Sequence, residues 1–148
     1  MRVVEKECHV PARTYIDKKY VASDGKEFIF ESDCLKYEEH LAIESHPIYT
    51  TAIKNAETFW DSYRATLYYI SSKEDYDFFK KTQGIDVEQE YYFDSNFNKY
   101  GAGWYIYHIE DGGDYPDYKY LRNYDAYEKM IESELERYKS YMRSLMGT

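Results

Sequence analysis

Cysteine, proline and glycine are scarce in this chain of 148 residues, and long apolar runs are absent. Two cysteines, Cys8 and Cys34, are too few for the disulfide framework of a small secreted domain. Three prolines and seven glycines, spread along the chain, leave no stretch typical of a flexible linker. No run approaches the roughly 20 apolar residues of a membrane helix, and no secretory-type signal is evident. We therefore expect a cytoplasmic protein with reduced thiols.

Tyrosine and acidic residues are abundant instead. The chain has 20 tyrosines, and 28 acidic residues against 19 basic ones give a net charge of −9. The imbalance is greatest between Glu74 and Asp117, where eleven acids accompany three lysines. A surface of this sign repels phosphate backbones and attracts basic proteins, although acidity can also serve solubility alone. The composition argues against direct nucleic-acid binding and favours a basic protein partner.

The length and the periodic patterns predict a single α+β domain with a mainly antiparallel sheet. We expect three successive parts: a strand-hairpin-helix unit over residues 1–45, a strand-helix-strands segment over 65–123, and a C-terminal helix over 124–146. The C-terminal helix has an apolar stripe that predicts packing on the sheet. The same stripe leaves a homodimer through this helix open, as an alternative to a monomer.

Residues 2–10 alternate like a strand, which we expect to break at Pro11. Asp24-Gly25 then favours a two-residue type I′ hairpin turn, because both central positions of that turn need positive φ. This turn predicts two cross-strand pairs, Val21 with Phe28 and Tyr20 with Ile29. The next helix is expected to have Ser32 as its N-cap and Asp33 in its first turn, with Cys34 packed beneath it. It should end near Ser45.

The middle of the chain contains one clear helix signal. Ser72 begins a capping box, which predicts a helix through Gln83 that ends before Gly84. Strands are expected on either side of this helix, over residues 65–71, 91–94, 104–110 and 118–121. Residues 46–64 are hard to interpret, and we expect a strand near Ile48–Ile53.

No arrangement of residues predicts catalysis, a cofactor or a metal. Cys8, His9, Cys34, His40 and His46 lack zinc-site spacing, and Asp111, Asp114 and Asp117 lack the pattern of a calcium loop. A nucleophile motif and a phosphate-binding glycine loop are also absent. His108 lies among aromatic residues, which favours packing over a role as a base. We therefore expect a protein that is not an enzyme.

Acids interleaved with tyrosines form the candidate binding site. Tyrosine offers a large contact area and a hydroxyl group, while carboxylates bind arginine and lysine. A core that uses tyrosine in place of leucine is the alternative interpretation. The predicted partner-binding residues are Asp86, Glu88, Glu90, Tyr91, Tyr92, Asp94, Glu110, Asp111, Asp114, Tyr115, Asp117 and Tyr118.

Several stretches resemble small accessory proteins of bacteriophages and mobile elements in Gram-positive bacteria. The stretches are Tyr20-Val-Ala-Ser-Asp-Gly-Lys-Glu-Phe28, Asp33-Cys34-Leu-Lys-Tyr37-Glu38, Tyr68-Tyr-Ile-Ser-Ser-Lys-Glu-Asp75, Gly103-Trp-Tyr-Ile-Tyr107 and Asp111-Gly-Gly-Asp114-Tyr115. The resemblance implies a phage accessory protein in the host cytoplasm, with no catalytic residues to transfer. Such proteins include anti-CRISPR and other anti-defence inhibitors.

The leading hypothesis is an inhibitor of a host nucleic-acid-binding protein, such as a CRISPR nuclease. Its acidic, tyrosine-rich face would act as a DNA mimic and occupy a basic groove of that protein. Two further hypotheses stay open. One is a sponge for a nucleotide immune signal, with Arg64 or Arg122 holding phosphates, and the other is a phage structural or assembly component. For an enzyme, the test is whether His9, His40, His46 or His108 lies in a cleft beside a carboxylate.

Overall fold

The computed structural model describes residues 1–10, 13–59 and 63–148. Within them the chain forms seven strands, all paired antiparallel, and five helices. The predicted α+β class with antiparallel pairing is thus confirmed, and the strands form two sheets. The chain divides into two compact units, Met1–Thr50 and Thr51–Thr148.

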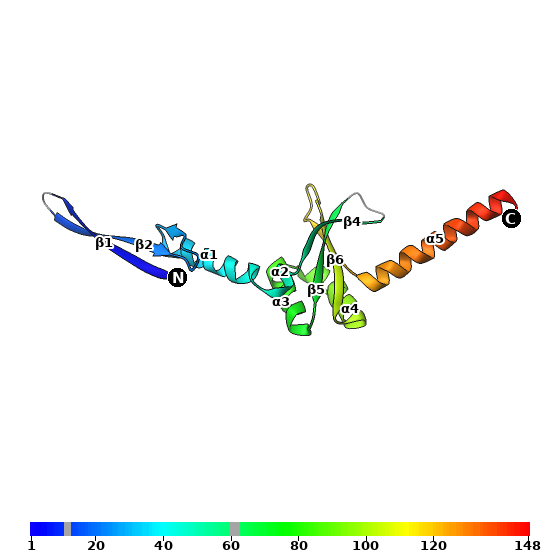
Figure 1. The fold of residues 1–148 in the computed structure, drawn as a ribbon, viewed down its shortest axis with the longest axis horizontal. Coiled ribbons are helices and arrows are strands. Elements are labelled where there is room, and N and C mark those ends of the chain that lie inside the picture. The colour runs from blue at the N-terminus through cyan, green and yellow to red at the C-terminus, as the bar shows by residue number, and fades with distance from the viewer. Residues whose placement is uncertain (11–12, 60–62) are drawn as a thin grey trace. The chain divides into compact units, whose positions relative to one another are not determined.

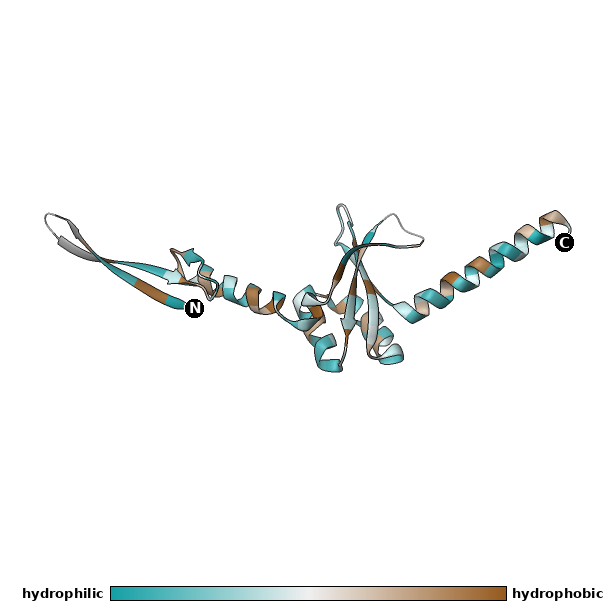
Figure 2. Ribbon diagram, viewed as in Figure 1, coloured by the Kyte–Doolittle hydropathy of each residue, from teal (hydrophilic) through white to brown (hydrophobic). Residues whose placement is uncertain are grey.

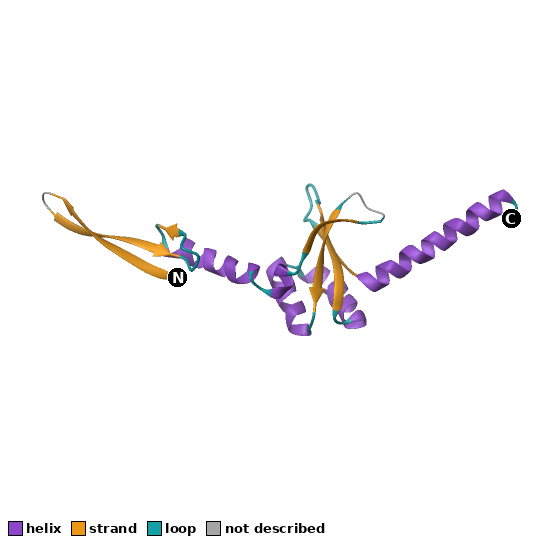
Figure 3. Ribbon diagram, in the orientation of Figure 1, coloured by secondary structure: helices purple, strands orange, loops and turns teal. Residues whose placement is uncertain are grey.

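The first unit contains a three-stranded sheet and two helices. Its elements are β1 (Arg2–Val10), β2 (Arg13–Val21), β3 (Glu27–Phe28), α1 (Glu31–Glu44) and α2 (Pro47–Thr50). The strand predicted over residues 2–10 is confirmed as β1, which pairs with β2 along its whole length in a long ribbon (Figure 3). The predicted break at Pro11 lies outside the described residues.

The turn between β2 and β3 differs from the predicted type I′ turn. Gly25 has a φ of +93°, but Asp24 does not have the positive φ that a type I′ turn requires. The Asp24 side chain instead accepts a hydrogen bond from Lys26 N at 3.0 Å. One left-handed residue after two ordinary turn residues makes a three-residue loop, which shifts the register by one. Tyr20 therefore pairs with Phe28 and Val21 with Glu27, and both predicted pairs are wrong.

Helix α1 begins earlier than predicted. Phe30 is its N-cap and makes no side-chain cap hydrogen bond, so Ser32 lies inside the first turn and its predicted capping role is wrong. Asp33 does lie in the first turn, and Ser45 ends the helix as expected. Cys34 is fully buried, and this burial raises the pKa of its thiol. A buried thiol with a raised pKa is a poor nucleophile.

The second unit contains a four-stranded sheet with the order β4-β5-β6-β7 (Figure 1). Its elements are β4 (Ile53–Glu57), β5 (Arg64–Ile70), α3 (Lys73–Gln83), α4 (Val87–Tyr100), β6 (Gly103–Glu110), β7 (Tyr118–Asn123) and α5 (Tyr124–Met146). The predicted helix with its Ser72 cap, and the strands over 65–71, 104–110 and 118–121, are confirmed. The strand near Ile48–Ile53 is wrong, because this stretch contains α2 and only the first residue of β4.

The strand predicted over residues 91–94 is also wrong. These residues lie inside α4, whose N-cap Asp86 accepts a hydrogen bond from Gln89 N at 2.9 Å. Phe93 and Phe97 are four residues apart and both buried, as expected for the inner face of a helix. The aromatic run Tyr91-Tyr92-Phe93 favours a strand locally, but the cap and this helical spacing outweigh it.

Aromatic rings fill the space between the second sheet and its two helices, α3 and α4. Tyr76 of α3 stacks on Phe97 of α4 with ring centroids 4.4 Å apart, and Phe79 meets Tyr107 of β6 edge-on at 5.3 Å. The buried rings of this layer are Tyr68, Tyr76, Phe79, Phe93, Phe97, Tyr105 and Tyr107. Three of the seven tyrosines between Glu74 and Asp117, namely Tyr76, Tyr105 and Tyr107, therefore belong to the core.

Helix α5 packs on the opposite face of the sheet through its first turns. Asn123 caps it by accepting a hydrogen bond from Ala126 N at 3.2 Å. Tyr127 and Ile131 pack against Ala65 and Ile106, which confirms the predicted contact with the sheet. Hydrophobic residues continue along the helix (Figure 2), but Leu135, Tyr138, Tyr141 and Leu145 are exposed. The packed part of the stripe is thus restricted to the beginning of the helix.

Candidate functional site

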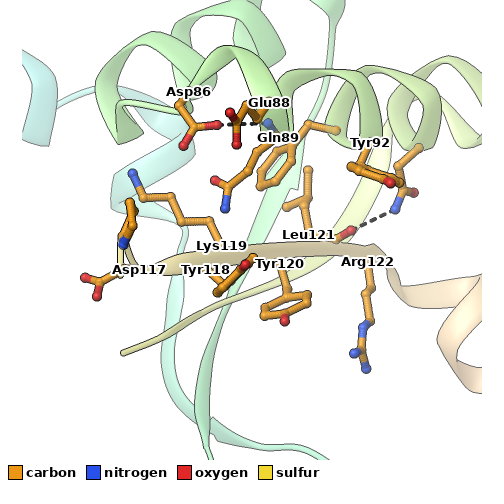
Figure 4. Close-up of a pocket in the computed structure, with 13 residues that line it drawn as sticks. Asp86, Glu88, Gln89, Tyr92, Asp117, Tyr118, Lys119, Tyr120, Leu121 and Arg122 are labelled. Carbon is orange, nitrogen blue, oxygen red and sulfur yellow. Dashed lines mark hydrogen bonds between the residues drawn. The ribbon is translucent and has the colours of Figure 1, made fainter. Parts of the chain in front are cut away.

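A groove of about 620 Å³ lies between α4 and β7 in the second unit (Figure 4). Helix α4 forms one wall, and β7 with the residues just before it forms the other. The lining residues are Asp86, Glu88, Gln89, Tyr92, Phe93, Asn96, Pro116, Asp117, Tyr118, Lys119, Tyr120, Leu121 and Arg122. This volume is within the usual range of ligand-binding sites.

The α4 wall follows from helical spacing. Gln89, Phe93 and Asn96 recur every three or four residues, so one face of the helix carries all three. Phe93 is buried and anchors this face to the core, whereas Tyr92 beside it is 74% exposed. The side chain of Gln89 extends from α4 toward β7 (Figure 4).

Among the described strands β7 pairs with β6 alone, so the β7 wall is an edge of the sheet. Side chains alternate along the strand: Lys119 and Leu121 point toward α4, and Tyr120 and Arg122 point to the other side (Figure 4). Lys119 Nζ donates hydrogen bonds to the carbonyls of Gln83 and Gly84, at 2.7 and 3.0 Å. Its charge is therefore used to cap the end of α3.

Two buried amide oxygens of the groove have no hydrogen-bond partner among the described residues. They are Gln89 Oε1 and Asn96 Oδ1. The other end of the Asn96 amide is used, because its Nδ2 donates to the carbonyl of Leu121 at 2.7 Å. Buried acceptors are rarely left unsatisfied in folded proteins. A ligand with N–H donors would satisfy both of these oxygens.

A network centred on Lys80 fixes α4 relative to α3. Lys80 Nζ lies 2.8 Å from both Glu90 Oε1 and Asp94 Oδ1, and Tyr76 donates its hydroxyl hydrogen to Asp94 at 2.7 Å. Burial alone would raise the pKa of Asp94, but hydrogen bonds from Lys80 and Tyr76 outweigh it and lower that pKa. Burial and the bond to Asp94 raise the pKa of the Tyr76 hydroxyl. The network thus holds one wall of the groove in place.

The structure brings five of the twelve predicted site residues together at the groove: Asp86, Glu88, Tyr92, Asp117 and Tyr118. Glu90 and Asp94 face α3 through the Lys80 network and do not line it. Tyr91 is 75% exposed and contacts the ring of Tyr92 edge-on at 5.7 Å.

The remaining predicted residues lie in or near the turn between β6 and β7. Asp111 Oδ1 accepts a hydrogen bond from Gly113 N at 2.8 Å, which stabilises that turn. Asp114 and Tyr115 are exposed at its tip. Glu110 lies at the end of β6, 3.4 Å from His108 Nε2. None of these four residues lines the groove.

Gln89, Asn96 and the inner residues of β7 line the groove but are not among the residues predicted from the sequence. The strand predicted over residues 91–94 hides the helical spacing that brings Gln89 and Asn96 to one face of α4. The missed signal is Asp86-x-x-Gln89, an N-cap residue followed three positions later by glutamine, which is typical of a helix start. That pattern would have placed Gln89 and Asn96 seven residues apart on one helix face.

The histidines and Arg64 lie outside the groove, whereas Arg122, the other candidate phosphate-binding arginine, lines it. His108 is buried between the rings of Tyr63 and Tyr120, and neither it nor Glu110 lines the groove. Arg64 forms an ion pair with Glu57 at 2.6 Å, while Arg122 lies 6.0 Å from the ring centroid of Tyr120.

The other histidines belong to the first unit. His40 pairs with Glu44 on the exposed surface of α1, and His46 Nδ1 accepts from Ile48 N. The side chain of His9 lies outside the described residues. In the described part of the chain, no three His, Cys, Asp or Glu side chains are grouped as a metal site requires.

Comparison of the chain with protein families, curated proteins and solved structures finds no match. Across residues 1–10, 13–59 and 63–148, no helix combines the length and the apolar character needed to cross a membrane.

Proposed function

We propose that this chain is a phage-encoded inhibitor of a host defence protein, a CRISPR nuclease being the leading candidate. The α4–β7 groove would bind a basic, nucleic-acid-binding surface of that protein. The observation that carries the proposal is that exposed carboxylates and exposed tyrosines lie together at the opening of the groove. The carboxylates are Asp86, Glu88 and Asp117, and the tyrosines are Tyr92 and Tyr118.

Electrostatics favour a basic partner at this groove. Two cations also line it, but both are engaged: Lys119 caps α3, and the guanidinium of Arg122 lies 6.0 Å from the ring centroids of both Tyr120 and Tyr127. The three carboxylates are left to attract arginine or lysine, and the two tyrosine rings offer cation–π contacts. Complementary charge should speed association and make it sensitive to salt.

The test is competition for DNA on a guide-loaded CRISPR nuclease from a Gram-positive host. Fluorescence anisotropy of a labelled target duplex would report displacement as the chain is added. The groove variant combines Asp86→Asn, Glu88→Gln and Asp117→Asn, which removes three charges but keeps the cap of α4 and the acceptor of Asp117. We expect about tenfold weaker inhibition at low salt, and a smaller loss of inhibition as salt is added.

A matched control removes the same number of charges elsewhere. Glu39→Gln, Glu128→Gln and Glu132→Gln change three exposed acids outside the groove and give the same net charge. This variant should inhibit like the unmodified chain. Equal inhibition by the groove variant and the control would refute the assignment of the groove as the binding surface.

A further inference from the structure

We infer that the groove binds its partner as an extended strand added to the open edge of β7. This inference rests on the proposed function, and it specifies the form in which the basic segment enters. Three observations carry it together: the unpaired edge of β7, the cavity beside that edge, and the two unpartnered amide oxygens on α4.

The edge of β7 supplies main-chain hydrogen-bonding groups. In a strand that pairs on one side only, every second residue directs its N–H and C=O away from its neighbour. One carbonyl of β7, that of Leu121, is bonded by Asn96. The groove lies next to the strand and to the two residues before it, from Pro116 to Arg122. An added strand would lie about 4.8 Å from β7, in the space between it and α4.

The wall opposite the edge is matched to a peptide backbone. Gln89 and Asn96 are seven residues apart on α4, which corresponds to about 10.5 Å along the helix axis. Three residues of an extended chain span about 10 Å. N–H groups three residues apart face opposite sides of a strand, so one strand can offer an N–H group to Gln89 Oε1 near one end of the groove or to Asn96 Oδ1 near the other, but not to both from the same side.

The carboxylates indicate the chemistry of the strand. Asp86 and Asp117 immediately precede α4 and β7, and Glu88 follows in the first turn of α4, so all three acids lie at one end of the groove. Phe93 and Leu121 are buried apolar residues farther along it. The occupant that fits is a segment with arginine or lysine at one end and alternating apolar residues after it, as in an edge or loop of a nucleic-acid-binding protein.

Backbone methylation of a model peptide tests this inference on the full chain. The probe is a capped heptapeptide, Lys-Arg-Val-Thr-Val-Arg-Lys, which is basic at both ends and therefore binds in either direction. N-methylation at odd or at even positions removes alternate N–H donors and leaves the charge unchanged. We expect the series that blocks the N–H groups facing β7 to bind at least about tenfold more weakly than the parent peptide by titration calorimetry, and the series that blocks those facing away from β7 to lose less affinity.

Amide exchange and two variants complete the test. The parent peptide should slow hydrogen exchange in residues 118–122, and Gln89→Leu should weaken its binding. The control Asn98→Leu, an exposed position of α4 that does not line the groove, should not weaken it. Any of three results would overturn strand addition. They are no binding of the parent peptide, equal binding of both methylated series, and slow hydrogen exchange in β7 that arises from self-association in the absence of peptide. The nuclease competition assay tests the proposed function separately. If recognition used side chains alone, the groove charges would still affect inhibition in that assay although strand addition had failed.

Discussion

Replacing Lys80 by methionine tests how α4 is held against α3. Methionine keeps most of the volume of the lysine stem but removes the ammonium group from Glu90 and Asp94. It also removes the cation that lies 5.1 Å from the centre of the Tyr76 ring. Asp94 would then retain the hydroxyl of Tyr76 as a donor, while Glu90 would lose its cation. The second unit should therefore be less stable.

The size of the loss follows from the exposure of the three groups. The Lys80 side chain is only 14% exposed, whereas those of Asp94 and Glu90 are 35% and 45% exposed. Breaking a fully buried ion pair costs on the order of 3–5 kcal/mol, whereas an exposed pair contributes at most about 1 kcal/mol. Since water screens the two carboxylates in part, we expect a loss of about 2 kcal/mol in the free energy of unfolding.

Urea unfolding monitored by tyrosine fluorescence and circular dichroism measures this loss. The matched control is Lys139→Met, which removes the exposed pair between Lys139 and Glu136 on α5 and should cost less than about 0.5 kcal/mol. If Lys80→Met lost no more stability than Lys139→Met, the network would not hold the helices together as described.

Three other perturbations probe the same unit. Asp94→Asn should reduce the loss of stability in acid. Because the pKa of Asp94 is lowered in the folded state, the carboxylate contributes its full stabilisation above the ordinary carboxyl pKa near 4. That stabilisation is lost as the pH falls through the folded-state pKa. Equal slopes of stability against pH for variant and parent below pH 4 would contradict this. Ser72→Ala should cost about 1 kcal/mol by thermal unfolding, because Ser72 Oγ accepts from Asp75 N at 3.1 Å; no change would show that the cap is unimportant. Phe79→Ala should cost about 3–5 kcal/mol, because the ring is fully buried against Tyr68 and Tyr107; a loss below about 1 kcal/mol would contradict the described core.

Local signals predicted most of the regular structure. The Ser72 cap, the left-handed Gly84 after α3 and the apolar stripe that begins α5 are each encoded within a few residues, and each is found as expected. The turn at Asp24-Gly25 was identified, but its type was wrong. The dipeptide permits more than one loop length, and the hydrogen bonds that Asp24 accepts from Lys26 and Tyr37 are not visible in a two-residue motif.

The groove depends on contacts that the sequence alone does not specify. Helix α4 and strand β7 lie side by side because Phe93 and Phe97 enter a core shared with α3 and the sheet, and no local pattern reports that pairing. Composition identified the acids and tyrosines of this region as a group. It could not separate Asp86 and Asp117, which line the groove, from Glu90 and Asp94, which bind Lys80. Selecting among chemically similar residues required their positions in space.

The most direct test of the binding site is a hydrogen-exchange footprint of the full chain in complex with a nuclease that it inhibits. The proposal predicts slower exchange in residues 86–96 and 116–122, which form the two walls of the groove. Unchanged exchange at both walls, with protection confined to α1 or to the exposed part of α5, would contradict it.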